Sequence, residues 1–163
     1  METLDSQVQS LYGGRVRIRV CGICIQENKL LMVNHKLYGS ESDFWSPPGG
    51  GINFGESASD ALKREFVEET GLEVIVGKML FVNEFIQPPL HAIEIFFEVV
   101  DFNGELVAGG DPEFSEHNQI LKEVRFLSFD EIEAIPKGSK HGILCDIQSI
   151  QDIFTIKGIN TSK

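Results

Sequence analysis

GGINFGESASDALKREFVEETGL, residues 50–72, has the residue pattern of a glycine-rich loop that leads into a helix. Ser57 is a favourable N-cap residue, and the residues that follow it as far as Thr70 are mostly good helix formers. Gly71 then supplies a C-terminal stop. The pattern therefore predicts a helix that begins just after Ser57 and ends at Thr70.

Three carboxylates share one face of this predicted helix. With ~100° between successive residues, Glu68 lies about 60° to one side of Glu65, and Glu69 lies about 40° to the other side. Like charges at this spacing destabilise a helix by ~0.2–0.5 kcal/mol per pair, and acidic residues in the last turn also oppose the helix dipole. Arg64 can reach Glu68 one turn later. A bound divalent cation would offset both penalties, and carboxylate oxygens suit Mg²⁺ or Mn²⁺.

The same residues resemble the signature of the Nudix hydrolase family. That signature is G-x5-E-x7-R-E-U-x-E-E-x-G-U, where U is a bulky aliphatic residue. The matching residues are Gly50, Glu56, Arg64, Glu65, Glu68, Glu69, Gly71 and Leu72, and Phe66 departs from the pattern at the first U position. The segment FWSPPGGG before the signature is also similar to the family's usual approach to it. The resemblance implies an α/β fold, a mixed β-sheet in an α/β/α sandwich, and hydrolysis of phosphoanhydride bonds.

The resemblance also assigns roles to individual residues. The implied ligands of Mg²⁺ or Mn²⁺ are Glu65, Glu68, Glu69 and the backbone carbonyl of Gly50. Arg64 would orient the glutamates, and Glu56 would support the start of the helix. The glycines would let the backbone approach the metal and the substrate phosphates, because no Cβ intrudes there; they are Gly49, Gly50 and Gly51.

Catalysis in the family often needs one further carboxylate from outside the signature. The candidates are Glu113, Glu116 and Glu123. We favour Glu116, because it lies in a long polar loop at residues 108–118, and loops of that length are usually functional or mobile. His117 beside it could act as a base, but a lone histidine in a loop is more often simply solvated.

Composition limits the partners and the location of the protein. Its 163 residues fit one domain, 1–163, with 1–14 and 155–163 expected to be loosely ordered. A net charge of −11 disfavours a surface that follows a long nucleic acid, whereas a small nucleotide can bind where metal ions neutralise the repulsion. The sequence has neither a basic, apolar leader nor a run of membrane-spanning length, so we expect a cytoplasmic protein without a membrane partner. A homodimer is allowed.

Outside the signature, the hydrophobic pattern predicts mainly strands. Residues 15–25 alternate arginines with apolar residues, which predicts a strand whose arginine face is either solvated, the commoner case, or in contact with substrate phosphates. Cys21 and Cys24, in that run, should face opposite sides of the strand as reduced core residues. Asn103-Gly104 predicts a hairpin into a strand at 105–107, and apolar spacing predicts a helix at 143–154.

Two classes of function remain open at this point. One is a metal-dependent hydrolase of nucleoside diphosphates linked to another group, and the other is a non-catalytic module that senses a nucleotide. The complete set of signature carboxylates favours the enzyme. Pro88 stands 16 positions after Leu72, which resembles Nudix enzymes that hydrolyse ADP-ribose, although prolines between two apolar runs are also ordinary loop residues. We therefore expect an ADP-sugar such as ADP-ribose first, and a nucleoside triphosphate second.

Overall fold

The computed structural model describes residues 4–36, 43–110, 112 and 121–163. Its strands are β1 (Val16–Gln26), β2 (Lys29–Lys36), β3 (Asp43–Ser46), β4 (Gly49–Gly51), β5 (Glu73–Gln87), β6 (Leu90–Asn103), β7 (Leu121–Leu127) and β8 (Ile159–Ser162). Its α-helices are α1 (Leu4–Tyr12), α2 (Ala58–Thr70) and α3 (Phe129–Ala134). Three 3-10 turns follow α3, at Lys137–Ser139, Gly142–Leu144 and Ile150–Thr155.

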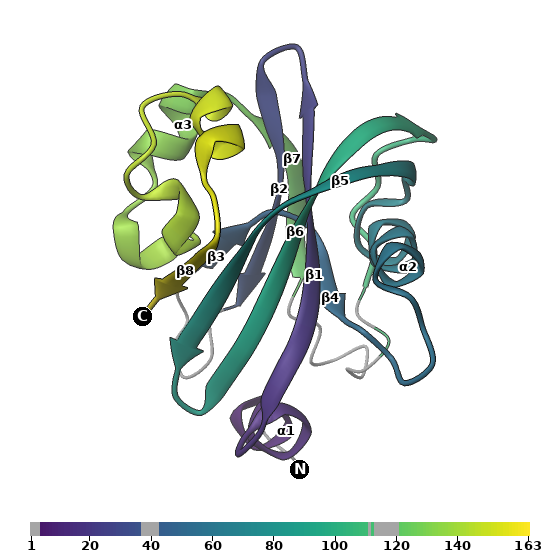
Figure 1. Ribbon diagram of the computed structural model, residues 1–163, viewed down its shortest axis with the longest axis vertical. Helices are drawn as coiled ribbons and strands as arrows, with labels where there is room; N and C mark the ends of the chain where they lie inside the picture. Colours follow the sequence, from purple (N-terminus) through teal and green to yellow (C-terminus); the bar gives the residue numbers. More distant parts are fainter. Residues whose placement is uncertain (1–3, 37–42, 111, 113–120) are drawn as a thin grey trace.

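The strands form a mixed sheet with helices on both faces, which confirms the predicted α/β fold. The main strand order is β3-β2-β1-β6-β5-β8, with β4 paired to β1 and β7 paired to β2. β1 and β6 run parallel, whereas β5 and β6 form a long antiparallel hairpin. Figure 1 shows α2 on one side of the sheet and α3 with the 3-10 turns on the other. Within the described residues, no helix is long and apolar enough to cross a membrane.

Each face of the sheet has its own apolar core. One core packs the sheet against α3 and the 3-10 turns, and it includes Cys21. The other core packs the sheet against α2 through Leu62 and Phe66, and it includes Cys24. Both cysteines are buried and free, so the prediction that they face opposite sides as reduced core residues is confirmed.

α2 begins and ends where the sequence predicts. The hydroxyl of Ser57 accepts a hydrogen bond from the backbone N–H of Asp60 at 3.1 Å, which satisfies one of the free donors of the first turn. At the other end, Gly71 adopts a left-handed conformation with φ 73°, and its N–H donates to the carbonyl of Val67. A side chain at position 71 would be strained in that conformation.

The hairpin predicted at Asn103-Gly104 is wrong, because no strand forms at residues 105–107. Instead, this segment crosses the C-terminal end of α2. The backbone N–H groups of Val107, Gly109 and Gly110 donate to carbonyls of the last helical residues, at 2.9, 3.0 and 3.2 Å. The last carbonyls of a helix have no partners within the helix. The N–H groups of this segment bind them, whereas in a hairpin the same N–H groups would pair with the neighbouring strand. It thereby fixes the turn of α2 that carries the glutamates.

Both ends of the chain are more regular than the sequence predicts. The described part of residues 1–14 contains α1 instead of a loose lead, and β8 pairs in parallel with β5 where fraying was expected. The helix predicted at 143–154 is replaced by two separate 3-10 turns. The carboxylate of Asp152 accepts from the N–H groups of Gln148 and Ser149, at 2.8 and 3.1 Å, and so starts a new turn at Ile150.

Phe66, the departure from the family signature, fits because β1 has a glycine opposite it. The Phe66 side chain is fully buried, and a Cβ added to Gly22 would lie 2.5 Å from its ring. We predict that Gly22→Ala lowers the free energy of unfolding by ~1–3 kcal/mol through overpacking. The cost should largely disappear in a Phe66→Leu background, because the two positions share one space.

Urea denaturation of the four proteins measures this coupling. Gly138→Ala serves as the matched control, since a Cβ at Gly138 would meet no atom within 4 Å. An equal cost of Gly22→Ala in both backgrounds would contradict the packing explanation.

Candidate active site

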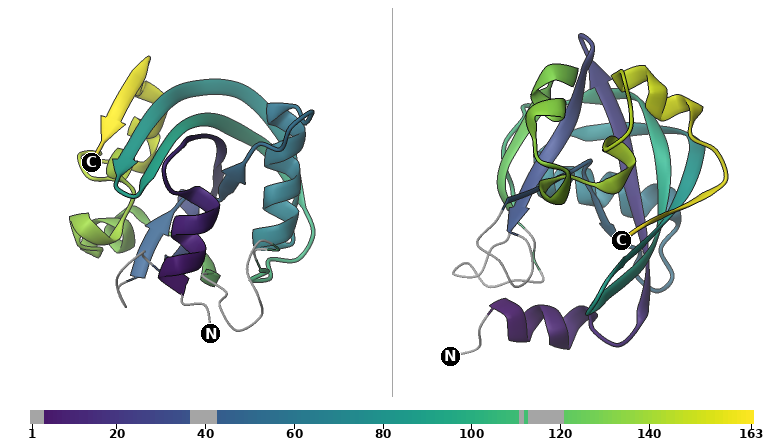
Figure 2. Two further views of the ribbon diagram at one scale, coloured as in Figure 1. Left: turned by 90° about the horizontal axis from the view of Figure 1, so that it is seen from below. Right: turned by 90° about the vertical axis from the view of Figure 1, so that its left-hand side faces the viewer.

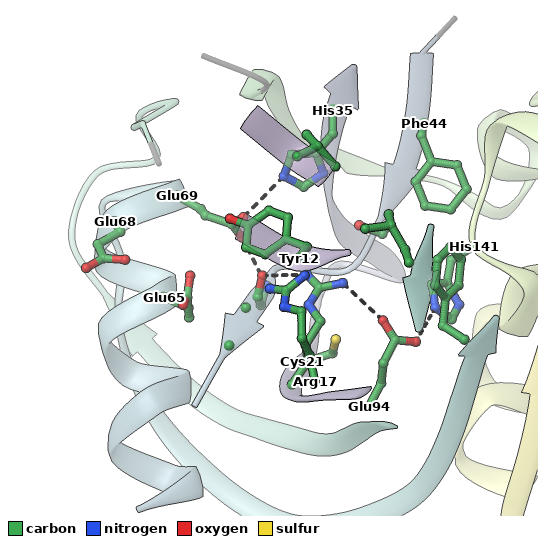
Figure 3. A pocket seen from close by; sticks show the side chains of 18 of the residues that line it. Tyr12, Arg17, Cys21, His35, Phe44, Glu65, Glu68, Glu69, Glu94 and His141 are labelled. Carbon is green, nitrogen blue, oxygen red and sulfur yellow. Dashed lines mark hydrogen bonds and ion pairs between the residues drawn. The ribbon is translucent and has the colours of Figure 1, made fainter. Parts of the chain in front are cut away.

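One open pocket brings most of the predicted site residues together. It has a volume of about 390 Å³ and lies between α2, β4 and the first half of β1. The predicted residues that line it are Glu65, Glu68, Glu69, Arg64, Gly49, Gly50 and Gly51. In the view of Figure 3, the three glutamates lie on one side of the pocket, and Phe44 and His141 lie on the other.

Arg64 holds the acidic face of α2 together. Its Nη1 donates to Glu65 at 2.8 Å and to Glu68 at 3.1 Å, and its Nε donates to Glu56 at 2.8 Å. Its Nη2 donates to the carbonyl of Gly51 at 2.9 Å. Hydrogen bonding to Glu56 is the largest contribution that raises the pKa of Arg64 above its ordinary value. One guanidinium therefore compensates the like charges on α2 and ties that helix to β4.

Glu69 points away from Arg64 and towards the strands. It is buried, and its two oxygens are bound by the N–H of Gly49 at 3.0 Å and by Nε2 of His35 at 3.2 Å. These contacts place one carboxylate of the acidic face directly against β4 and β2. His35 belongs to the site by position, although the sequence analysis did not select it.

The glycines of β4 are required by the close approach of α2 and β1. A Cβ at Gly50 would lie 2.3 Å from the carboxylate of Glu65, and a Cβ at Gly49 would lie 2.0 Å from the carbonyl oxygen of Val20. The backbone therefore comes as near to Glu65 as it can without a side chain between them. In this structure, the missing Cβ of Gly50 leaves room for the carboxylate of Glu65.

The surroundings of Glu65 suit a hard divalent cation. Burial raises the pKa of Glu65 to about 7, and the negative charges of Glu69 and Glu68 add to that effect, while Arg64 opposes it. Among the described residues, no three His, Cys, Asp or Glu side chains already converge on one point. The donor chemistry nevertheless fits, because these are oxygen donors crowded on one rigid helix turn whose mutual repulsion a cation would relieve.

The arginine face of β1 is turned to the pocket, contrary to the commoner expectation of a solvated face. Val16 and Ile18 are 54% and 47% exposed, whereas Arg17 and Arg19 are half-buried and line the pocket. The alternation predicted by the sequence is present, but at this end of the strand the polar side faces inward. Arg19 pairs there with the buried carboxylate of Glu94, so a solvated arginine face does not describe this end of the strand.

A buried polar network around Glu94 was not predicted from the sequence. This carboxylate, 1% exposed, accepts from Arg19 at 3.1 Å, from Asn83 at 3.0 Å and from His141 Nε2 at 2.7 Å. Burial alone would raise the pKa of Glu94, but His141 and Arg19 outweigh burial and lower it. The N–H of Ile143 donates to Nδ1 of His141 at 3.3 Å, which leaves Nε2 as the protonated nitrogen. A charged residue inside the apolar run of β6 was the available signal.

Of the three candidates for a further catalytic carboxylate, the described residues include Glu123. Glu113 and Glu116, like His117, lie outside the described residues. Glu123 is exposed on β7, pairs with Arg125 at 3.5 Å, and does not line the pocket. Pro112, in the loop that carries the favoured Glu116, does line the pocket.

Comparison with known proteins gives a family match over most of the chain. A model of the NUDIX domain matches residues 15–144. An ADP-ribose pyrophosphatase of Methanocaldococcus jannaschii is 35% identical over 123 residues, which cover 72% of this chain and 70% of that relative. An 8-oxo-dGTP diphosphatase of Proteus vulgaris is 31% identical over 84 residues, which cover 52% of this chain and 75% of that relative.

Solved structures support the same fold. A MutT Nudix hydrolase from Burkholderia pseudomallei has a TM-score of 0.63 at 20% identity, over 78% of this chain and 92% of that one. A MutT protein from Methanosarcina mazei also has a TM-score of 0.63, at 19% identity, over 86% of this chain and 91% of that one. With the family model matching well over half of its length, this chain belongs to the Nudix hydrolase family, as its signature residues predict.

Proposed function

We propose that this Nudix hydrolase is metal-dependent and cleaves phosphoanhydride bonds in nucleoside diphosphates linked to another group, with ADP-ribose as the first candidate substrate. The observation that supports it most is the arrangement of Glu65, Glu68 and Glu69 on one turn of α2, against the glycines of β4, in a pocket that arginines of β1 also line. An acidic helix alone would repel a diphosphate. Acidic and basic walls around one pocket suit a metal-bound diphosphate.

The proposed metal ligands are Glu65, Glu68, Glu69 and the carbonyl of Gly50. A bound Mg²⁺ or Mn²⁺ ion would lower the pKa of a water molecule and neutralise charge on the phosphates. Arg64 keeps two of the glutamates on one side of the helix, and the N–H of Gly49 with His35 holds the third. These contacts limit the freedom of the carboxylates before any ligand binds, which reduces the cost of ordering them later.

The proposed reaction adds water across one phosphoanhydride. The water oxygen forms a bond to one phosphorus, the bridging P–O bond breaks, and a proton from the water passes to a base. ADP-ribose would give AMP and ribose 5-phosphate. The base stays a prediction, with Glu116 favoured, and the support for it is the neighbouring Pro112 in the pocket wall.

ADP-ribose is placed first because a relative that is 35% identical over 72% of this chain is an ADP-ribose pyrophosphatase. Pro88 and Pro89 form the turn between β5 and β6, and Phe85 and Leu90 on either side of that turn line the pocket. Neither proline lines the pocket, so any influence on substrate selection would act through Phe85 and Leu90. A nucleoside triphosphate is the second candidate, because the Proteus vulgaris relative is an 8-oxo-dGTP diphosphatase.

The wider proposal keeps the expectations from composition. Residues 1–163 form a single domain, the partner is a small nucleotide instead of a long nucleic acid or a membrane, and the protein is cytoplasmic. The net charge of −11 supports a small nucleotide as the partner over a long nucleic acid. The homodimer stays open.

We predict that Glu68→Gln lowers kcat by at least ~100-fold, because a charged metal ligand is lost. The melting temperature should stay unchanged or rise, since one repulsion on α2 is removed while a glutamine oxygen can still accept from Arg64. Steady-state kinetics and thermal melting measure both. Glu133→Gln, an exposed residue of α3 on the other face of the sheet, is the matched control and should turn over like the wild type. Full turnover by Glu68→Gln would exclude its proposed role.

A substrate panel read by chromatography tests the choice of nucleotide. ADP-ribose, other ADP-sugars and nucleoside triphosphates, including 8-oxo-dGTP, are compared at equal concentration with Mg²⁺. We expect ADP-ribose to have the highest kcat/KM and to yield AMP with ribose 5-phosphate. Faster turnover of a triphosphate, with release of pyrophosphate, would overturn the substrate order and leave the metal-site proposal standing.

A further inference from the structure

The pocket has a wall of aromatic rings opposite the acidic face of α2. Phe44 of β3, Phe85 of β5 and His141 all line the pocket. Phe44 and Phe85 are half-buried, whereas His141 is only 3% exposed. In Figure 3, Phe44 and His141 lie across the pocket from the three glutamates. We call Phe44, Phe85 and His141 the aromatic wall.

The rings of the aromatic wall lie close together. The ring centroid of Phe44 is 6.4 Å from that of Phe85 and 6.4 Å from that of His141, and the centroids of Phe85 and His141 are 6.1 Å apart. Phe44 and Phe85 meet edge to face at 62°, whereas Phe85 and His141 stack at 28°. A flat aromatic ligand can therefore lie against the face of one ring and meet another ring at its edge, and both contacts are favourable.

Buried contacts hold the aromatic wall from behind. Nε2 of His141 donates to the carboxylate of Glu94 at 2.7 Å. The backbone N–H of His141 donates at 2.8 Å to the carbonyl of Trp45, the residue after Phe44 in β3. The ring of His141 also lies 5.6 Å from that of Phe96, which is fully buried in the core. The wall is thus formed before a ligand binds, which reduces the cost of binding.

The polar groups behind the wall are already used by one another. Oε1 of Glu94 accepts from Arg19, and Oε2 accepts from Asn83 and His141. Nδ1 of His141 accepts from the N–H of Ile143, so both ring nitrogens have partners. The wall therefore presents ring faces and edges to the pocket, which suit a flat, uncharged group better than a phosphate.

Tyr12, another aromatic residue of the pocket, has different surroundings. It belongs to α1, which Figures 1 and 2 show beside the end of the β5–β6 hairpin. The guanidinium carbon of Arg17 lies 3.7 Å from the centroid of its ring, so Tyr12 packs against a charged group. Phe44 and Phe85 pack against aromatic rings instead, and they are the better candidates to contact a neutral part of the substrate.

We propose that Phe44 and Phe85 bind the nucleobase of the substrate by stacking, while its phosphates lie at the glutamates of α2. A nucleobase is flat and uncharged, and the ribose separates it from the phosphates, so one nucleotide can reach both walls. The pocket volume of about 390 Å³ is in the range of small-molecule sites. The inference rests on the proposed function and adds to it the subsite for the base.

A comparison of AMP with ribose 5-phosphate tests the proposal, because the two ligands differ by the base. Isothermal titration calorimetry in buffer with Mg²⁺ gives both Kd values for the wild type, Phe44→Leu and Phe85→Leu. We expect the wild type to bind AMP about tenfold or more tighter than ribose 5-phosphate. Each leucine variant should weaken AMP binding by about three- to twentyfold and bind ribose 5-phosphate within about twofold of the wild type.

Two further variants separate the ring from general damage to the fold. Phe44→Tyr keeps the ring face and should bind AMP within about twofold of the wild type. Phe54→Leu is the matched control, since Phe54 is fully exposed before α2 and does not line the pocket. It should bind both ligands like the wild type. Unchanged binding of ribose 5-phosphate by Phe44→Leu also shows that the variant is folded.

Kinetics with the best substrate of the panel supply the second measurement. Phe44→Leu should raise KM by about the same factor as the Kd of AMP and change kcat by less than about twofold, as expected for lost uniform binding.

Three results would each overturn the proposal. They are a wild type that binds AMP no more tightly than ribose 5-phosphate, equal losses of both ligands in Phe44→Leu, and equal losses of AMP in Phe44→Tyr and Phe44→Leu. If no nucleotide is hydrolysed, the proposed function fails, whereas the affinities for AMP and ribose 5-phosphate still decide the role of the aromatic wall.

Discussion

The approach of α2 to the glycine strand β4 is the constraint on which the rest of the site depends. Glu65 lies so close to Gly50 that any side chain at that position would collide with its carboxylate. Arg64 makes this approach stable, because it binds glutamates of α2 and the carbonyl of Gly51 at the same time. Without the guanidinium of Arg64, the three carboxylates on one face of α2 would repel each other, and no positive charge would offset that repulsion.

The fold is arranged to keep α2 in that position. Phe66 anchors the helix to the sheet in the space left by Gly22, and the segment after β6 donates hydrogen bonds to its last carbonyls. Elements outside the NUDIX match then contact the pocket or the polar network beside it. α1 brings Tyr12 to Arg17, and Ser162 of β8 accepts from Asn83, which in turn donates to Glu94. The helix α2 and the N-terminal helix α1 thus border one pocket, while β8 supports the polar network around Glu94.

Features that depend on neighbouring residues could be predicted from the sequence, whereas features that depend on contacts with distant segments could not. Ser57, Gly71 and the acidic face of α2 follow from capping and helical spacing, and the structure has all of them. Asn103-Gly104 has the residues of a tight hairpin, but the free carbonyls of α2 provide better partners for the segment that follows. The side of β1 on which Arg17 and Arg19 lie could not be predicted either. Alternating polar and apolar residues show that the two faces of a strand differ, but they do not show which face borders a pocket.

The proposed function requires that the glutamates of α2 hold a divalent cation beside β4. Crystals soaked in Mn²⁺ test it most directly, because anomalous scattering locates that ion independently of the protein density. We expect a Mn²⁺ peak within about 2.0–2.4 Å of carboxylate oxygens from Glu65, Glu68 and Glu69, and near the carbonyl of Gly50. Mn²⁺ bound only at other acidic surfaces, with these carboxylates still held by Arg64 and His35, would contradict it.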